Sequence, residues 1–153
     1  MISFMPPIHI QAHLLDRPNA VLPRYQTDGA AGMDLRAAIE LPIVIHPFGR
    51  ATLPTGLVLA IPVGYEGQVR PRSGISLSKG LLVITGTIDS DYRGEIGIIC
   101  INLNVREDFV VTPGMRLAQI VFAPVVRAQL ESTPEGELSP TMRGINGFGS
   151  TGR

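Results

Sequence analysis

Two aspartates in the middle of the chain are the residues best suited to acid–base chemistry. Asp89 and Asp91 lie in the segment GTIDSDYRGE, residues 86–95. In an extended chain their side chains point the same way, with backbones about 7 Å apart. One of two paired carboxylates can activate a water while the other holds structure or a metal-bound water. A hairpin with solvated acids, or a pairing of Asp91 with Arg93, remains open as an alternative.

Three other segments carry groups that could bind an anion. Residues 71–74 (PRSG) combine an arginine, a hydroxyl and a glycine, which suits an anion as well as an ordinary turn. Asp34 and Arg36 straddle a leucine in an apolar run, where they either bind a ligand or form a structural salt bridge. Residues 144–152 are rich in glycine and contain Phe148, so this stretch is either a loose tail or a phosphate cradle.

Charge and composition exclude several classes of protein. The chain has 13 Lys and Arg against 13 Asp and Glu, a formal net charge of zero, so we expect no nucleic-acid partner. With 44% hydrophobic residues it is not a disordered chain. Cys100 is the single cysteine and lies in an apolar run, which predicts a buried thiol. No apolar stretch is long enough for a membrane span and no signal peptide is recognised, so we expect a cytoplasmic protein.

Short strands joined by turns are expected to position these groups. The 17 glycines and 13 prolines are too many for a helical bundle, and turn signals recur at the spacing typical of a β-sandwich or barrel. The expected strands cover residues 8–10, 40–45, 52–53, 55–61, 67–70, 81–85, 96–103, 109–112 and 116–126. Residues 33–40 and 75–80 are candidates for short helices, and the second would end at Gly80.

Five segments, in order, resemble the five motifs of the trimeric dUTP diphosphatases (dUTPases). They are residues 31–37 (AGMDLRA), 71–74 (PRSG), 86–95 (GTIDSDYRGE), 114–119 (GMRLAQ) and 143–152 (RGINGFGSTG). The resemblance runs from Tyr25 to Arg153. It implies an all-β, single-domain β-barrel or jelly-roll-like subunit. It also implies a homotrimer with active sites at subunit interfaces. The implied activity is Mg²⁺-assisted hydrolysis of dUTP to dUMP and diphosphate, which keeps uracil out of DNA and supplies dUMP for thymidylate synthesis.

The resemblance also implies roles for single residues. Asp89 would orient and deprotonate the attacking water, and Gln119 would support that water and the α-phosphate. Asp34 would contact Mg²⁺ through water, because the metal prefers phosphate oxygens and keeps several waters. Tyr92 would lie against the deoxyribose and exclude a 2′-hydroxyl. The other substrate-binding residues implied are Arg72, Ser73, Gly74, Thr85, Gly86, Thr87, Ile88, Gly97, Arg143, Phe148, Gly149, Ser150 and Thr151.

The chain is expected to divide into a β core at residues 1–130, a polar, proline-containing linker at 131–142 and a flexible, glycine-rich tail at 143–153, which the resemblance makes a lid. Within the lid, Arg143 would reach the γ-phosphate and Phe148 would stack on the base. Two other functions of this fold are alternatives, namely a dCTP deaminase-like enzyme and a non-catalytic nucleotide-binding regulator. The aspartate of the central motif and the phenylalanine of the tail favour the diphosphatase.

Two features depart from the family pattern. The segment before Gly86 is two residues shorter than is usual and lacks the usual asparagine, so that Thr85 is the nearest polar side chain. Asn146 stands where the family usually has glycine, and asparagine tolerates a positive φ better than most residues.

Overall fold

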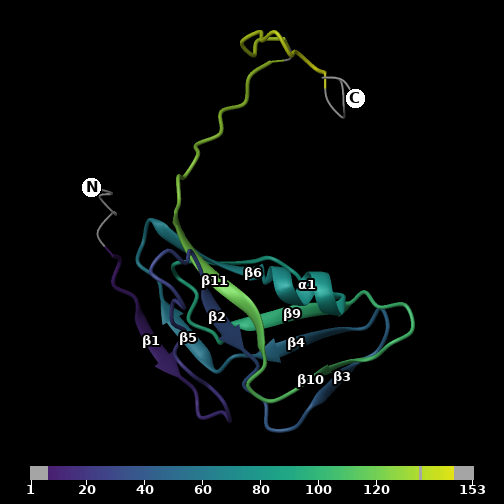
Figure 1. The fold of residues 1–153 in the computed structure, drawn as a ribbon. Helices are drawn as coiled ribbons and strands as arrows, with labels where there is room; N and C mark the ends of the chain where they lie inside the picture. The colour runs from purple at the N-terminus through teal and green to yellow at the C-terminus, as the bar shows by residue number, and fades with distance from the viewer. Residues whose placement is uncertain (1–6, 135, 147–153) are drawn as a thin grey trace.

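Short strands form most of the regular structure, and one short helix accompanies them (Figure 1). The computed structural model describes residues 7–134 and 136–146. The strands are β1 (Gln11–Leu14), β2 (Met33–Arg36), β3 (Ile43–Ile45), β4 (Arg50–Pro54), β5 (Leu57–Ala60), β6 (Tyr65–Pro71), β7 (Leu81–Val83), β8 (Gly86–Ile88), β9 (Gly97–Asn102), β10 (Phe109–Val111) and β11 (Arg116–Pro124), and the helix is α1 (Ser73–Lys79).

The strands form several small antiparallel sheets. The largest has the strand order β2-β11-β6-β8, and a second has the order β4-β9-β7. Two further sheets have two strands each, β1 with β5 and β10 with β3. The expected all-β fold is therefore confirmed. Among the described residues these sheets do not join into one continuous closed barrel.

Alternation along the strands separates one apolar core from the surface. In β9, Ile98 and Cys100 are fully buried, whereas Ile99 between them is 41% exposed. Leu53 of β4 and Ile120 of β11 belong to the same buried cluster, so both larger sheets contribute to it. Burial raises the pKa of the Cys100 thiol to about 11, and the side chain is a neutral core residue, as its apolar setting predicts.

Two expectations about local structure were wrong. Residues 33–36 form strand β2 rather than a helix, because Leu35 packs into the core while the strand pairs with β11. The first strand covers 11–14 rather than 8–10 and pairs with β5. The helix expected at 75–80 is confirmed but begins at Ser73, and it ends at Gly80 with a φ of 64°.

The chain after β11 leads away from the sheets (Figure 1). Its described residues, up to 134 and then 136–146, contain no helix or strand and are exposed. The hydrogen bonds of residues 141–146 are local, as in the bond from Arg143 Nε to the Asn146 carbonyl at 2.9 Å. Within the described ranges, no helix has the length and apolar character needed to cross a membrane.

Candidate active site

Strand pairing places three polar side chains in a row on the outer face of the largest sheet. Gln119 of β11 lies opposite Asp34 of β2 on one side and Arg70 of β6 on the other. Their neighbours along the strands, such as Ile120, point into the core, so this row faces outward. Gly32 allows the row to form, since a Cβ there would lie 2.5 Å from the Gln119 amide oxygen.

Beside this row lies a hollow of about 670 Å³, which we call the arginine hollow. It is lined by Gln26, Ala30, Gly32, Asp34, Arg72, Ser73, Gly74, Ile75, Ser78, Lys79, Arg116 and Gln119. The hollow brings together five of the residues that the sequence predicts for the site, namely Asp34, Arg72, Ser73, Gly74 and Gln119. Its size lies within the range of small-molecule sites.

Ion pairs organise one wall of the arginine hollow. Arg72 Nε lies 2.9 Å from Asp34 Oδ1, and Arg116 Nη1 lies 3.2 Å from Asp34 Oδ2. Arg72 Nη1 also donates to the backbone carbonyl of Arg116 at 3.0 Å. The expectation of a salt bridge between Asp34 and Arg36 is therefore wrong. Arg36 donates to the Gly114 carbonyl instead, at 3.4 Å.

The start of α1 presents Ser73 and Gly74 to the same hollow. Both are exposed, and a Cβ on Gly74 would meet nothing within 4 Å, so the backbone there is open to a ligand. The far end of the helix is fixed, because Asn104 Nδ2 donates to the Lys79 carbonyl at 3.0 Å and the tight approach of Asn104 requires glycine at position 80. Gln119 Nε2 donates to the Pro71 carbonyl at 3.0 Å, which ties the strand to this turn.

Asp89 lies in a different hollow. This aspartate hollow is lined by Val63, Gly64, Tyr65, Glu66, Thr87, Asp89, Ser90, Asp91, Val125 and Arg127. Asp89 follows β8 and opens a turn in which the Tyr92 N–H donates to its carbonyl at 3.1 Å. The extended arrangement of Asp89 and Asp91 was thus wrong. Arg93 donates to the carbonyls of Ser90 and Tyr92, at 2.7 and 2.8 Å, rather than pairing with Asp91.

The two hollows share no lining residue. Gln119 lies opposite Arg70, whereas Ile88, just before Asp89, lies opposite Gly67, and two strand spacings separate β11 from β8. Standard strand geometry puts the backbones of Gln119 and Asp89 about 16 Å apart. Within one chain, Asp89 therefore cannot act on a phosphate held beside Gln119.

Tyr92 is held in place after this turn. Its hydroxyl donates to the Glu95 carbonyl at 2.9 Å, and its ring covers Gly94, where a Cβ would lie within 3 Å of ring atoms. The side chain is 43% exposed, so the ring offers a fixed apolar surface to a ligand.

The remaining predicted residues are spread over the fold. Thr85 stands between β7 and β8, which pair with β9 and β6 respectively, so the segment is a crossing between two sheets rather than a hairpin. Gly86, Thr87 and Ile88 form β8, and Gly97 begins β9. Arg143 is described and exposed, whereas Phe148, Gly149, Ser150 and Thr151 lie outside the described residues.

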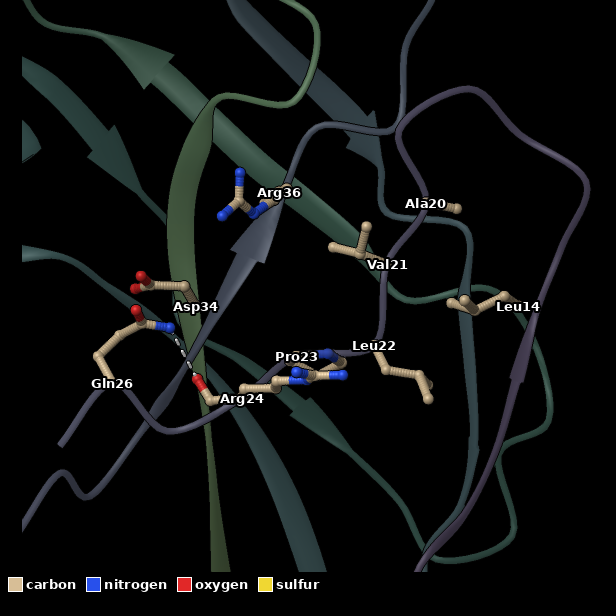
Figure 2. A pocket seen from close by; sticks show the side chains of 9 residues that line it. All are labelled: Leu14, Ala20, Val21, Leu22, Pro23, Arg24, Gln26, Asp34 and Arg36. Carbon is tan, nitrogen blue, oxygen red and sulfur yellow. Dashed lines mark hydrogen bonds between the residues drawn. The ribbon is translucent and has the colours of Figure 1, made fainter. Parts of the chain in front are cut away.

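A neighbouring hollow shares Asp34 and Gln26 with the arginine hollow. Figure 2 shows its polar side, with Asp34, Arg36 and Gln26, opposite an apolar side formed by Leu14, Ala20 and Val21. Sequence reasoning missed Arg116 as a lining residue of the arginine hollow. The sequence feature that could have indicated Arg116 is its position in the segment GMRLAQ, three residues before Gln119.

The described residues contain no group of three or more His, Cys, Asp or Glu side chains able to cage a metal ion. The donor set nonetheless fits magnesium that arrives with a triphosphate, since such an ion keeps most of its ligands from phosphate and water. Asp34, with a side chain that is 12% exposed, is the carboxylate that lines the arginine hollow.

Comparison with known proteins agrees with the motifs and the fold. The dUTPase family model matches residues 18–152. The deoxyuridine 5′-triphosphate nucleotidohydrolase of Syntrophotalea carbinolica is 56% identical over 135 residues, covering 87% of this chain and 90% of the relative. The protein of the same name from Mesorhizobium japonicum is also 56% identical, covering 86% and 82%.

Solved structures give the same result. The dUTPase of Staphylococcus bacteriophage 80alpha, a mutant solved with dUpNHpp, has a TM-score of 0.82 and 29% identity, covering 95% of this chain and 99% of its own. A mutant dUTPase of phage phi11 of S. aureus, described with a structural Mg(II) ion, has a TM-score of 0.77 and 28% identity, covering 85% and 99%. The chain is an all-β protein with a surface hollow whose lining includes Arg72 and Arg116. It belongs to the dUTPase family.

Proposed function

We propose that this protein hydrolyses dUTP to dUMP and diphosphate. The observation that carries the proposal is the arginine hollow, where Arg72, Ser73 and Gln119 meet beside an open glycine backbone. Guanidinium and hydroxyl donors fixed before the substrate arrives are what charge stabilisation at a phosphoryl centre requires. The relatives named deoxyuridine 5′-triphosphate nucleotidohydrolase support dUTP as the substrate.

The reaction assigns one task to each group. Asp89 accepts a proton from water as the water oxygen attacks the α-phosphorus, and the bond from that phosphorus to the bridging oxygen breaks to release diphosphate. Arg72 and the Ser73 hydroxyl bind phosphate oxygens, and Gln119 holds the α-phosphate and the water in line. Asp34 would hold the water shell of a Mg²⁺ ion that comes with the triphosphate, and such an ion would neutralise part of the substrate's negative charge.

We further propose a homotrimer in which Asp89 of one subunit faces the arginine hollow of another. Two observations support a site shared between subunits, and the resemblance to trimeric dUTPases supports the number three. Asp89 and Gln119 of one chain are too far apart to act together, and the outer face of the β4-β9-β7 sheet exposes Leu82, Ile84 and Ile99, each about 40%. An apolar patch of this kind is typical of a subunit contact. A cytoplasmic location completes the proposal, since a DNA precursor is its substrate.

Diphosphate release from each of the common deoxynucleoside triphosphates, with Mg²⁺ present, tests the activity. We expect release from dUTP far above that from dATP, dGTP and dCTP. Equal release from all of them would contradict the proposal, and ammonia released from dCTP would indicate a deaminase instead.

Tyr92 is expected to select deoxyribose. A fixed ring against C2′ leaves neither room nor a partner for a hydroxyl, so the kcat/KM for UTP should be about 100-fold below that for dUTP. Tyr92→Ala should reduce the difference in kcat/KM between dUTP and UTP. Tyr92→Phe, which keeps the ring and loses only the bond to Glu95, should preserve it. Comparable kcat/KM values for UTP and dUTP in the wild type would contradict this role.

The short crossing at residues 84–85 is expected to change base selectivity. Backbone groups near Thr85 and Gly86 can match the O4 and N3–H edge of uracil, which cytosine presents inverted. Thymine is rejected by contact of its 5-methyl with this wall, and a wall two residues shorter lies farther from the methyl. We expect dCTP to be disfavoured by at least ~100-fold and dTTP to be rejected less strongly.

Steady-state kcat/KM values for dUTP, dTTP and dCTP, measured side by side, check this expectation. If dCTP competes with dUTP, backbone recognition of uracil is wrong. If dTTP is rejected as strongly as dCTP, the short crossing does not widen the pocket.

A further inference from the structure

We propose that Arg116 is a further phosphate-binding cation beside Arg72 and that Asp34 is the positioning residue that holds the guanidinium groups of Arg72 and Arg116 side by side. The inference rests on the proposed function, because it assigns these residues to the triphosphate. It adds a residue to the phosphate site, and it gives Asp34 a task that does not depend on a metal.

Asp34 lies between the two arginines with each carboxylate oxygen engaged. Oδ1 meets Arg72 Nε at 2.9 Å and Oδ2 meets Arg116 Nη1 at 3.2 Å. A hydrogen bond from Arg72 Nη1 to the Arg116 carbonyl, at 3.0 Å, ties the two arginines directly. Two guanidinium groups this close would repel each other, and the carboxylate between them offsets that repulsion. Asp34 is 12% exposed, so the pairs are shielded more than surface pairs are.

Donors are left over for a ligand. A guanidinium carries five N–H groups. In the part of the chain that the structure describes, Arg72 and Arg116 each donate one side-chain hydrogen bond, and Arg72 Nε also forms an ion pair with Asp34. Both side chains line the arginine hollow, and the Arg116 side chain is 45% exposed, so its free donors are accessible. Two cations against one carboxylate leave this wall with a net positive charge, as a polyanion requires.

Arg36 supplies a matched control. It lies opposite Arg116 in the strand register, so it carries the same charge one strand away. Its side chain bonds to the Gly114 carbonyl and lines the neighbouring hollow of Figure 2, not the arginine hollow. Removing the charge of Arg36 tests whether triphosphate binding depends on any nearby cation or on Arg116 in particular.

The experiment compares Arg116→Gln, Arg116→Lys, Asp34→Asn and Arg36→Gln in the full-length protein. Calorimetry measures the Kd of the dUTP analogue dUpNHpp and of dUMP, and melting temperature reports stability. Arg116→Gln is expected to raise the Kd of dUpNHpp by about 10- to 100-fold, the range for loss of charge-assisted hydrogen bonds. The Kd of dUMP should not change, because dUMP lacks the two outer phosphates. Arg116→Lys should recover part of the loss, and Arg36→Gln should match the wild type.

Asp34→Asn tests the positioning role. It should also weaken dUpNHpp, and combining it with Arg116→Gln should cost less than the product of the two single effects, because both act through one contact. Independent effects would overturn the positioning role. Wild-type affinity for dUpNHpp in Arg116→Gln, or equal losses for dUpNHpp and dUMP with a lowered melting temperature, would overturn the role of Arg116. A wild-type protein that does not hydrolyse dUTP would instead refute the proposed function.

Discussion

Asp89→Asn is expected to reduce kcat for dUTP by at least ~100-fold, the usual scale for loss of a general base. The amide has the size of the carboxylate but does not accept a proton from water at neutral pH. Asp89 is exposed and outside the core, so the variant should keep its melting temperature, its oligomeric state and its affinity for dUpNHpp. Near-normal turnover in this variant would refute the assignment of the base.

Mixed assemblies test where Asp89 acts. Asp89→Asn and Arg72→Gln subunits should each be inactive alone. When the two are co-expressed and assemble at random, about a quarter of the sites combine an intact Asp89 with an intact Arg72 from different subunits, and turnover should recover to that extent. A mixture as inactive as its components would show that each site uses both residues of one chain.

Deleting residues 143–153 is expected to reduce kcat/KM by at least ~100-fold while the core stays folded. The tail would supply base stacking by Phe148 and a γ-phosphate contact by Arg143, and losing a stacked base and a charge-assisted hydrogen bond together has this magnitude. Stability should not change, because the described tail residues 143–146 are exposed and the hydrogen bonds they form with other described residues are to residues 141–146.

The melting temperature of the truncated protein is the control for the tail. An unchanged melting temperature with lost turnover supports a lid joined by a linker at 131–142. A steep fall in melting temperature would show that the tail stabilises the core. Phe148→Ala is the milder variant and should lose about 1–3 kcal/mol of binding free energy.

The strand pattern was predictable because local chemistry determines it. Alternation places Ile98 and Cys100 in the core, and Gly80 ends the helix because glycine adopts a positive φ readily. The strand at Met33–Arg36 was not predictable from propensity, because its partner β11 lies about eighty residues away in the chain. The end of the three-residue strand β7 and the change of sheet at Thr85 likewise depend on distant pairing.

The site was predictable in its parts and not in its arrangement. The motifs indicate Arg72, Ser73 and Gln119, which the structure brings into one hollow. Spacing along the chain does not show that Asp89 lies at the opposite edge of the sheet, since that depends on the order β2-β11-β6-β8. The ion pairs of Asp34 could not be predicted either, because both partners come from other strands or loops.

The separation of the two hollows on one sheet has a kinetic consequence. If a complete site needs two copies, the specific activity becomes a function of enzyme concentration. Upon dilution below the dissociation constant of the assembly, turnover per subunit should decay with time, and on reconcentration it should return with a lag. In a cell, the rate of this reaction would then rise more than in proportion to the amount of the protein.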